Sequence, residues 1–320
     1  MSPSLPSLEA LECAARIVYD VLPATPQYAW PLLGARLGAH LWVKHENHTP
    51  TGAFKVRGGL VYFDGLRARM PECRGVISAT RGNHGQSVGF AARRHGVPAA
   101  IVVPHGNSVE KNAAMRALGV ELIEHGADFQ AAREHAAQVA EARGLHAVPS
   151  FHHDLVAGVA TYAMELMRAV PDLDVAYVPI GLGSGACGMI AARAALGRKV
   201  EIVGVVSAHA PSYALSLAAG RPIEAPATTA LADGMACRIA DAEARAILAA
   251  GLARIVQVSD AEVAEAMRVL FSDSHNVAEG AGAAGLAAAM QERARIAGKR
   301  VAIVLSGGNV DRAQFAQVIA

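Results

Sequence analysis

Short apolar segments alternate with alanine-rich segments along the whole 320-residue chain. The apolar segments have the length and β-branched content of strands, at residues 41–46, 75–80, 99–104, 120–125, 174–181, 200–207, 253–259 and 301–308. Between them, apolar residues recur at helical spacing, as at residues 108–119, 128–144 and 260–271. This alternation predicts parallel sheets covered by helices on both faces. The number of strands is too large for a single sheet, and we therefore expect two α/β domains.

Composition and charge exclude several classes of protein. Apolar residues make up 52% of the chain, and 29 basic residues nearly balance 28 acidic ones, with no basic stripe of the kind that binds nucleic acid. The N-terminal residues lack the pattern of a signal peptide, and no apolar run reaches about 18 residues, so we expect no membrane span. The cysteines are far apart in the sequence, which predicts free thiols and a cytoplasmic protein: Cys13, Cys73, Cys187 and Cys237.

Four strand ends carry unusual sequences, and ligands of open parallel sheets bind at the carboxyl ends of strands. They are "TPTGAFKVRGG" (49–59) around Lys55, "RGNHGQS" (81–87), "GLGSGACG" (181–188) and "SGGN" (306–309). Glycines before a helix allow a phosphate to approach free backbone N–H groups. A phosphate cradle, a reactive lysine and small polar residues together fit pyridoxal phosphate (PLP), whose aldehyde forms a Schiff base with lysine. A nucleotide site at "GLGSG" is the alternative, although the acidic ribose partner is missing.

Six motifs in order resemble the fold-type-II PLP enzymes, the family of threonine/serine dehydratases and serine racemase. They are "PTGAFKVRGG", "SATRGNHGQS", "PIGLGSGACG", "LADGMA", "AEGAGAAGLAA" and "LSGGNVD", and they span nearly the whole chain. The resemblance implies the tryptophan synthase β-like fold, with two open, twisted, mostly parallel sheets flanked by helices. It also implies a small domain at residues 52–149 and a large PLP-binding domain built from residues 1–51 and 150–320.

The resemblance assigns roles residue by residue. Lys55 matches the Schiff-base lysine, Phe54 a residue that packs on the cofactor ring, and Asn83 the partner of the ring hydroxyl. Ser306 matches the residue that faces the pyridine nitrogen, and Glu279 a glutamate near the ring. The phosphate cup corresponds to Gly181, Leu182, Gly183, Ser184 and Gly185. The loop that holds the substrate carboxylate corresponds to Thr80, Arg81, Gly82, Asn83 and His84.

The implied reaction is β-elimination from an L-3-hydroxy amino acid resembling threonine or serine, which gives a 2-oxo acid and ammonia. A bulkier substrate, either an aryl-serine such as phenylserine or 3-hydroxyaspartate, is an alternative, and Val159 favours an apolar substituent if it faces the site. Amino-acid racemisation and non-catalytic PLP binding are further alternatives. Arg81 stands where serine racemase has a serine, and arginine is a poor proton donor near neutrality, so we expect little racemase activity.

We expect no metal site. Several family members bind a divalent cation through carboxylates after the strand that corresponds to residues 200–207, but here that segment reads "SAHAPSYA". His152, His153 and Asp154 are adjacent, and neighbouring histidines on a loop are expected to point apart. The expected partners are a small amino-acid substrate and a second copy of the chain in a homodimer. The sequence stops soon after "SGGNVD", which resembles catabolic members that lack an effector domain.

Overall fold

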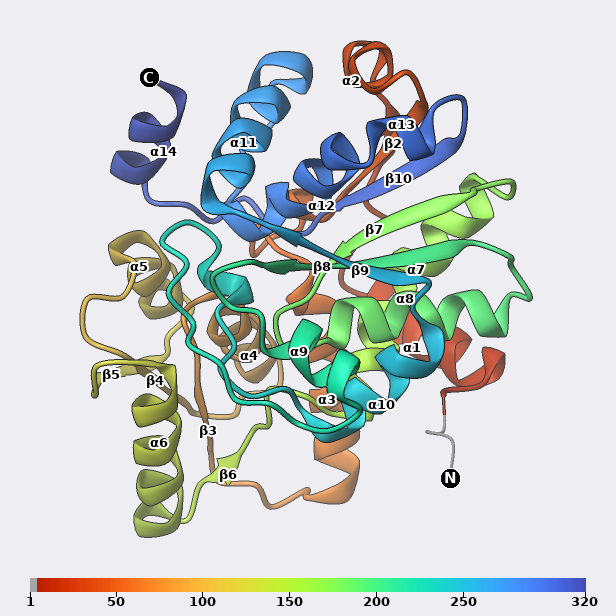
Figure 1. The fold of residues 1–320 in the computed structure, drawn as a ribbon. Helices are drawn as coiled ribbons and strands as arrows, with labels where there is room; N and C mark the ends of the chain where they lie inside the picture. Colours follow the sequence, from red (N-terminus) through yellow and green to blue (C-terminus); the bar gives the residue numbers. More distant parts are fainter. Residues whose placement is uncertain (1–4) are drawn as a thin grey trace.

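The computed structural model describes residues 5–320, which form two open sheets flanked by helices (Figure 1). The larger sheet has the order β1 (Gln27–Ala29), β2 (His40–His45), β10 (Arg300–Leu305), β7 (Val175–Pro179), β8 (Glu201–Ser207) and β9 (Arg254–Val258). The smaller sheet has the order β5 (Glu121–Glu124), β4 (Ala99–Val103), β3 (Val76–Ala79) and β6 (His146–Ala147). Only the β1–β2 pair is antiparallel in the described sheets. The predicted fold class is therefore confirmed.

Each predicted strand corresponds to a strand of the structure, and the sequence missed two short ones at sheet edges, β1 and β6. The strands of the smaller sheet all fall inside the proposed small domain at residues 52–149. The domain boundaries themselves stay a prediction.

The three predicted helices begin where a side chain can accept from the first-turn N–H groups. Ser108 caps α5 (Val109–Ala117), Asp128 caps α6 (Phe129–Arg143), and Ser259 forms a capping box on α11 (Asp260–Ser274). The other helices are α1 (Leu8–Tyr19), α2 (Pro31–Leu37), α3 (Lys55–Arg69), α4 (Asn83–Arg94), α7 (His153–Ala169), α8 (Ser184–Ala195), α9 (Ser212–Ala219), α10 (Ala242–Gly251), α12 (Gly280–Gln291), α13 (Arg293–Ile296) and α14 (Arg312–Ile319). Two 3₁₀ turns, η1 (Glu46–His48) and η2 (Asp233–Met235), lie in connecting segments. Across residues 5–320, no helix is long and apolar enough to cross a membrane.

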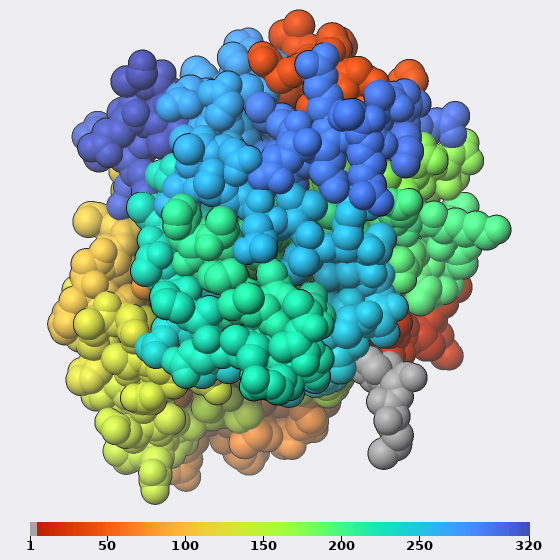
Figure 2. Space-filling view, in the orientation of Figure 1, coloured from red at the N-terminus to blue at the C-terminus, as the bar shows by residue number. Residues whose placement is uncertain are grey.

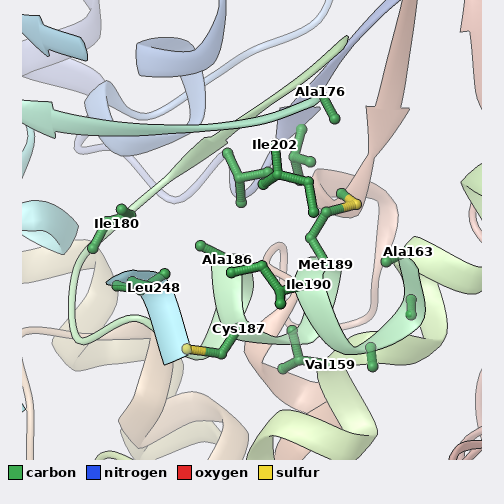
Figure 3. Close-up of a cluster of buried hydrophobic side chains, with 14 of the residues drawn as sticks. Val159, Ala163, Ala176, Ile180, Ala186, Cys187, Met189, Ile190, Ile202 and Leu248 are labelled. Atoms are coloured by element: carbon green, nitrogen blue, oxygen red, sulfur yellow. The ribbon is translucent and has the colours of Figure 1, made fainter. Parts of the chain in front are cut away.

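The larger sheet buries a core on each face because alternate residues of a strand point to opposite sides. On β7, Ala176 and Val178 join an apolar cluster with α7, α8 and α10, whereas Val175 and Tyr177 join another with α11 and α12. Figure 3 shows part of the first cluster, where Met189 and Ile190 of α8 lie near Ile202 of β8. Both faces of the sheet are thus covered, as the apolar strands predict.

Backbone hydrogen bonds connect the segment before Lys55 to the end of β10. Ala53 bridges Gly307, the Phe54 N–H donates to the Ser306 carbonyl at 3.0 Å, and the Gly308 N–H donates to the Gly52 carbonyl at 2.9 Å. These bonds place the start of α3 beside the carboxyl end of the central strand. Two of the four unusual strand ends therefore meet directly.

Candidate active site

Lys55 is the first residue of α3 and lines two cavities. Its Nζ lies 5.1 Å from the centroid of the Phe54 ring. Desolvation by the surrounding protein lowers the pKa of Lys55 to about 8, although the charge of Glu279 opposes the shift. A substantial fraction of this amine is therefore neutral near physiological pH, which is the form that attacks an aldehyde or accepts a proton.

The first cavity, here the Lys55–Ser306 cavity, contains every residue that the sequence assigned to the cofactor. It is lined by Phe54, Lys55, Asn83, Pro179, Gly181, Leu182, Gly183, Ser184, Gly185, Gly234, Met235, Glu279, Ala281 and Ser306. Ser306 is 6% exposed and lines this cavity. It is therefore available to a ligand.

The glycines of this cavity form a cup at the N-terminus of α8. Gly183 has a φ of +99°, a conformation that favours glycine. A Cβ on Gly181 would lie 2.2 Å from the Gly234 carbonyl oxygen, so no larger residue fits there without a shift. Gly183 is the N-cap of α8 and offers no side chain to the first-turn N–H groups. Those groups and the helix dipole suit a phosphate.

These features match what PLP requires. A lysine with a lowered pKa can bind its aldehyde, the glycine cup can hold its phosphate, and the hydroxyl of Ser306 can meet its ring nitrogen. The roles of the individual residues remain predictions, and their placement around one cavity supports them.

The second cavity, here the Lys55–Arg81 cavity, brings the predicted substrate loop to Lys55. It is lined by Lys55, Ala79, Thr80, Arg81, Gly82, Asn83, His84, Lys111, Phe129, Ser150, Gly181, Leu182, Asp233, Gly234, Ala236 and Cys237. The segment between α9 and α10, which carries η2, lies near the centre of the face shown in Figure 2 (teal) and forms one wall of this cavity. The volume of the Lys55–Arg81 cavity is about 80 Å³.

The loop geometry depends on Gly82 and His84. Gly82 has a φ of +155°, and a Cβ there would lie 2.4 Å from Cδ of Lys111. Burial, followed by the nearby charge of Lys55, lowers the pKa of His84 to about 3, so its imidazole is neutral at physiological pH. The loop therefore approaches Lys55 closely without adding a second positive charge from His84.

A buried ion cluster beside the loop was missed by the sequence analysis. Lys111 Nζ lies 2.8 Å from Oδ2 of Asp233 and 3.0 Å from Oε2 of Glu279. Asn83 donates to Glu279 at 2.5 Å and accepts from Asn309 at 2.9 Å. Asp233 lies in the family-like motif "LADGMA", whereas Lys111 lies in an ordinary helix pattern that gives no signal. The cluster holds the Asn83 amide in place at the edge of both cavities.

Arg57 was also missed, although it lies two residues after Lys55. Its guanidinium is fully buried and donates to Glu46 at 2.7 and 3.0 Å and to Glu165 at 2.6 and 3.1 Å. Lys44 donates to Glu165 at 2.5 Å. These bonds tie the first turn of α3 to α7 and to the end of β2, and so fix the start of the helix that carries Lys55.

Two expectations from the sequence are wrong. Val159 is 1% exposed and belongs to the apolar cluster of Figure 3, packed beside Gly58 and Gly188, and it lines neither cavity. It therefore gives no reason to expect an apolar substrate. The rings of His152 and His153 do not point apart, because their centroids are 3.9 Å apart. With Asp154 they form a possible cation site, but Asp154 already pairs with Arg69 Nη1 at 2.8 Å, and the expectation of no metal stays a prediction.

The fold and the features of the two cavities fit one class of protein, the α/β enzymes that depend on PLP. A family model described as "Pyridoxal-phosphate dependent enzyme" matches residues 19–307, and the chain belongs to this family. The predicted family and cofactor are thereby confirmed.

Three curated relatives carry names of ammonia-lyases or dehydratases. The chain is 34% identical over 306 residues to an L-threonine ammonia-lyase of Thermotoga maritima, which covers 95% of this chain and 76% of the relative. It is 34% identical over 297 residues to a biosynthetic L-threonine dehydratase of Haemophilus influenzae, covering 92% of this chain but only 58% of that relative. It is 31% identical over 307 residues to an L-threo-3-hydroxyaspartate ammonia-lyase of Saccharomyces cerevisiae, covering 96% and 94%.

Solved structures agree in fold. Maize serine racemase superposes with a TM-score of 0.91 at 26% identity, covering 98% of this chain and 97% of the other. The processed form of threonine deaminase isoform 2 from Solanum lycopersicum superposes with a TM-score of 0.89 at 27% identity, covering 99% and 95%. Dehydratases and racemases thus share this architecture, and the site must distinguish them.

Proposed function

We propose that the chain is a PLP-dependent ammonia-lyase that converts an L-3-hydroxy amino acid, threonine-like or serine-like, into a 2-oxo acid and ammonia by β-elimination. The observation that carries the proposal is that Lys55, with its lowered pKa, lines both the cofactor-type cavity and the cavity of the predicted substrate loop. The names of the curated relatives support the same reaction.

Each part of the site has a distinct task. When bound, PLP supplies an electron-withdrawing ring that stabilises negative charge at the substrate Cα. The N–H groups at the start of α8 would hold the phosphate, and the Ser306 hydroxyl would donate a hydrogen bond to the ring nitrogen. The neutral amine of Lys55 removes the Cα proton. Backbone N–H groups of residues 80–84 orient the substrate carboxylate, so that this proton lies within reach of Lys55.

Two features favour elimination over racemisation. Ser306 is a neutral hydrogen-bond donor and, unlike an aspartate, does not stabilise a protonated ring nitrogen. The ring therefore stabilises negative charge at the substrate Cα less strongly. Racemisation also needs a proton donor on the face opposite Lys55, and Arg81 stands where serine racemase has its serine. Because a guanidinium holds its proton firmly near neutrality, it is a poor donor for that step.

A substrate panel tests the proposal. The purified protein loaded with PLP is incubated with L-threonine, L-serine, threo-3-hydroxyaspartate and phenylserine, and 2-oxo acid and ammonia are measured together. We expect equal amounts of both products from at least one substrate, and chiral chromatography should find little D-isomer. A yellow protein that releases no 2-oxo acid from any of them would favour non-catalytic PLP binding. D-isomer formed at the rate of 2-oxo acid release would favour the racemase alternative.

The remaining parts of the proposal rest on the sequence. They are a cytoplasmic homodimer and the division into a small domain at residues 52–149 and a large domain at residues 1–51 and 150–320. Size-exclusion chromatography with light scattering tests the dimer.

A further inference from the structure

Arg81 has an unsatisfied nitrogen in the Lys55–Arg81 cavity. Its Nε is buried and has no hydrogen-bond partner, and within residues 5–320 no carboxylate pairs with its guanidinium. Lys111 lines the same cavity, but Asp233 and Glu279 neutralise its charge. Apart from Lys55, which is partly neutral near physiological pH, Arg81 is therefore the cation of this cavity whose charge the side chains of residues 5–320 leave uncompensated.

His84 provides a second unsatisfied nitrogen on the same loop. Its side chain lines the same cavity, the residue is 7% exposed, and Nε2 has no hydrogen-bond partner among the described residues. Buried polar nitrogens without partners are rare and unfavourable, because they have lost water and gained nothing in return. Two of them beside Lys55 indicate that a ligand supplies the missing partners.

We propose that Arg81, together with His84, selects a substrate with a second carboxylate on Cβ, that is, a 3-hydroxy dicarboxylic amino acid. This inference rests on the proposed ammonia-lyase function and specifies its substrate class. A carboxylate accepts hydrogen bonds from a guanidinium in a geometry that compensates the charge as well. In the net reaction the Cβ–OH and Cα–N bonds break, and the water lost in elimination is regained on hydrolysis. The products are a 2-oxo dicarboxylate and ammonia.

An aryl substituent is the competing occupant, since Phe129 and Leu182 also line the cavity. An aromatic ring could stack on the guanidinium, but it has no strong acceptor for Arg81 Nε or for His84 Nε2. Val159, the residue that favoured an apolar substituent, lies in the core instead. The unsatisfied nitrogens therefore favour the carboxylate.

The test compares threo-3-hydroxyaspartate with threonine, which differ by a carboxylate against a methyl group on Cβ. We expect Arg81→Gln to lower the ratio of the two kcat/KM values by about 10- to 100-fold, the range that loss of a charge-assisted hydrogen bond implies. Arg81→Lys should keep part of the preference, because it keeps the charge. Arg94→Gln, at the exposed end of α4, the helix that follows the Arg81 loop, is the matched control and should leave the ratio unchanged.

Binding without turnover gives a second readout. Succinate should raise the thermal midpoint of the PLP-loaded protein more than butyrate does, and Arg81→Gln should remove the difference. An equal loss of kcat/KM on both substrates would overturn the proposal and assign Arg81 to the α-carboxylate. An unchanged ratio, or a wild-type preference for phenylserine, would also overturn it. Ammonia from threonine alone would refute this inference but keep the ammonia-lyase function, whereas no ammonia from any substrate would refute that function.

Discussion

Removal of the Arg57 guanidinium should destabilise the protein strongly and loosen the helix that carries Lys55. Arg57 is 0% exposed and joins Glu46 and Glu165, which lie on other parts of the fold. The change Arg57→Met keeps most of the side-chain volume and removes the charge. Breaking one side of a buried ion pair costs about 3–5 kcal/mol, because the remaining charge is left uncompensated.

The contacts that Glu165 and Glu46 keep in the Arg57→Met variant place the expected loss of stability in the lower part of this range. Glu165 keeps Lys44 at 2.5 Å and the Tyr19 hydroxyl at 2.9 Å, so it stays compensated. Among the side chains of residues 5–320, Glu46 keeps only the Thr25 hydroxyl, at 2.6 Å, and is itself 0% exposed. One stranded carboxylate rather than two should therefore remain, and we expect a loss of about 3 kcal/mol.

Urea unfolding of the cofactor-free protein measures this loss, with Arg143→Met as the control. Arg143 forms a bidentate ion pair with Glu121 at the surface. Because water already solvates both of these charges, we expect a much smaller loss of stability from Arg143→Met. The double variant Arg57→Met/Glu46→Gln removes the stranded charge and should recover part of the stability. A loss below about 1 kcal/mol, or a double variant no more stable than the single one, would refute the reasoning.

Four further predictions concern the site and its supports. Competitive labelling of the cofactor-free protein should find Lys55 half-reactive near pH 8, and a midpoint above pH 10 would contradict its desolvation. Gly181→Ala should weaken PLP binding by at least about 10-fold in equilibrium dialysis, because its Cβ would lie 2.2 Å from the Gly234 carbonyl. Ser306→Asp should lower kcat and alter the visible spectrum, since a carboxylate favours a protonated ring; an unchanged rate and spectrum would count against the contact. Burial alone would raise the pKa of Glu165, but the charges of Arg57 and Lys44 lower it. The contribution of Glu165 to stability is therefore present above the ordinary glutamate pKa, and it is lost as the pH falls through the lowered pKa. Unfolding of Glu165→Gln against pH should show a weaker acid dependence, and an identical dependence would contradict the pairing.

The sheets and the cofactor cavity were predictable because their signals are local. A parallel strand buried on both faces is a continuous apolar run, and a glycine cup before a helix appears as a short motif such as "GLGSG". Edge strands as short as β1 and β6 carry too few residues for a pattern, and they were missed.

The supporting contacts were not predictable because they join residues far apart in the sequence. Arg57 and Glu165 are 108 positions apart in the sequence, and Lys111 and Asp233 are 122 positions apart. No local sequence pattern therefore predicts either pair. The orientation of Val159 failed for a related reason. On a helix packed on several sides, as α7 is, a buried apolar residue can face either the site or the core, and only the tertiary arrangement decides.

The central claim is that Lys55 carries the cofactor and acts on the substrate, and one measurement tests it most directly. The PLP-loaded protein is treated with borohydride, which fixes the covalent linkage, and the modified peptide is identified by mass spectrometry. The account predicts that the cofactor's mass is found on Lys55 alone, and that Lys55→Ala loses both this label and ammonia release while it remains folded. A label on another lysine, or steady ammonia release by the folded Lys55→Ala variant without an added amine, would contradict the account.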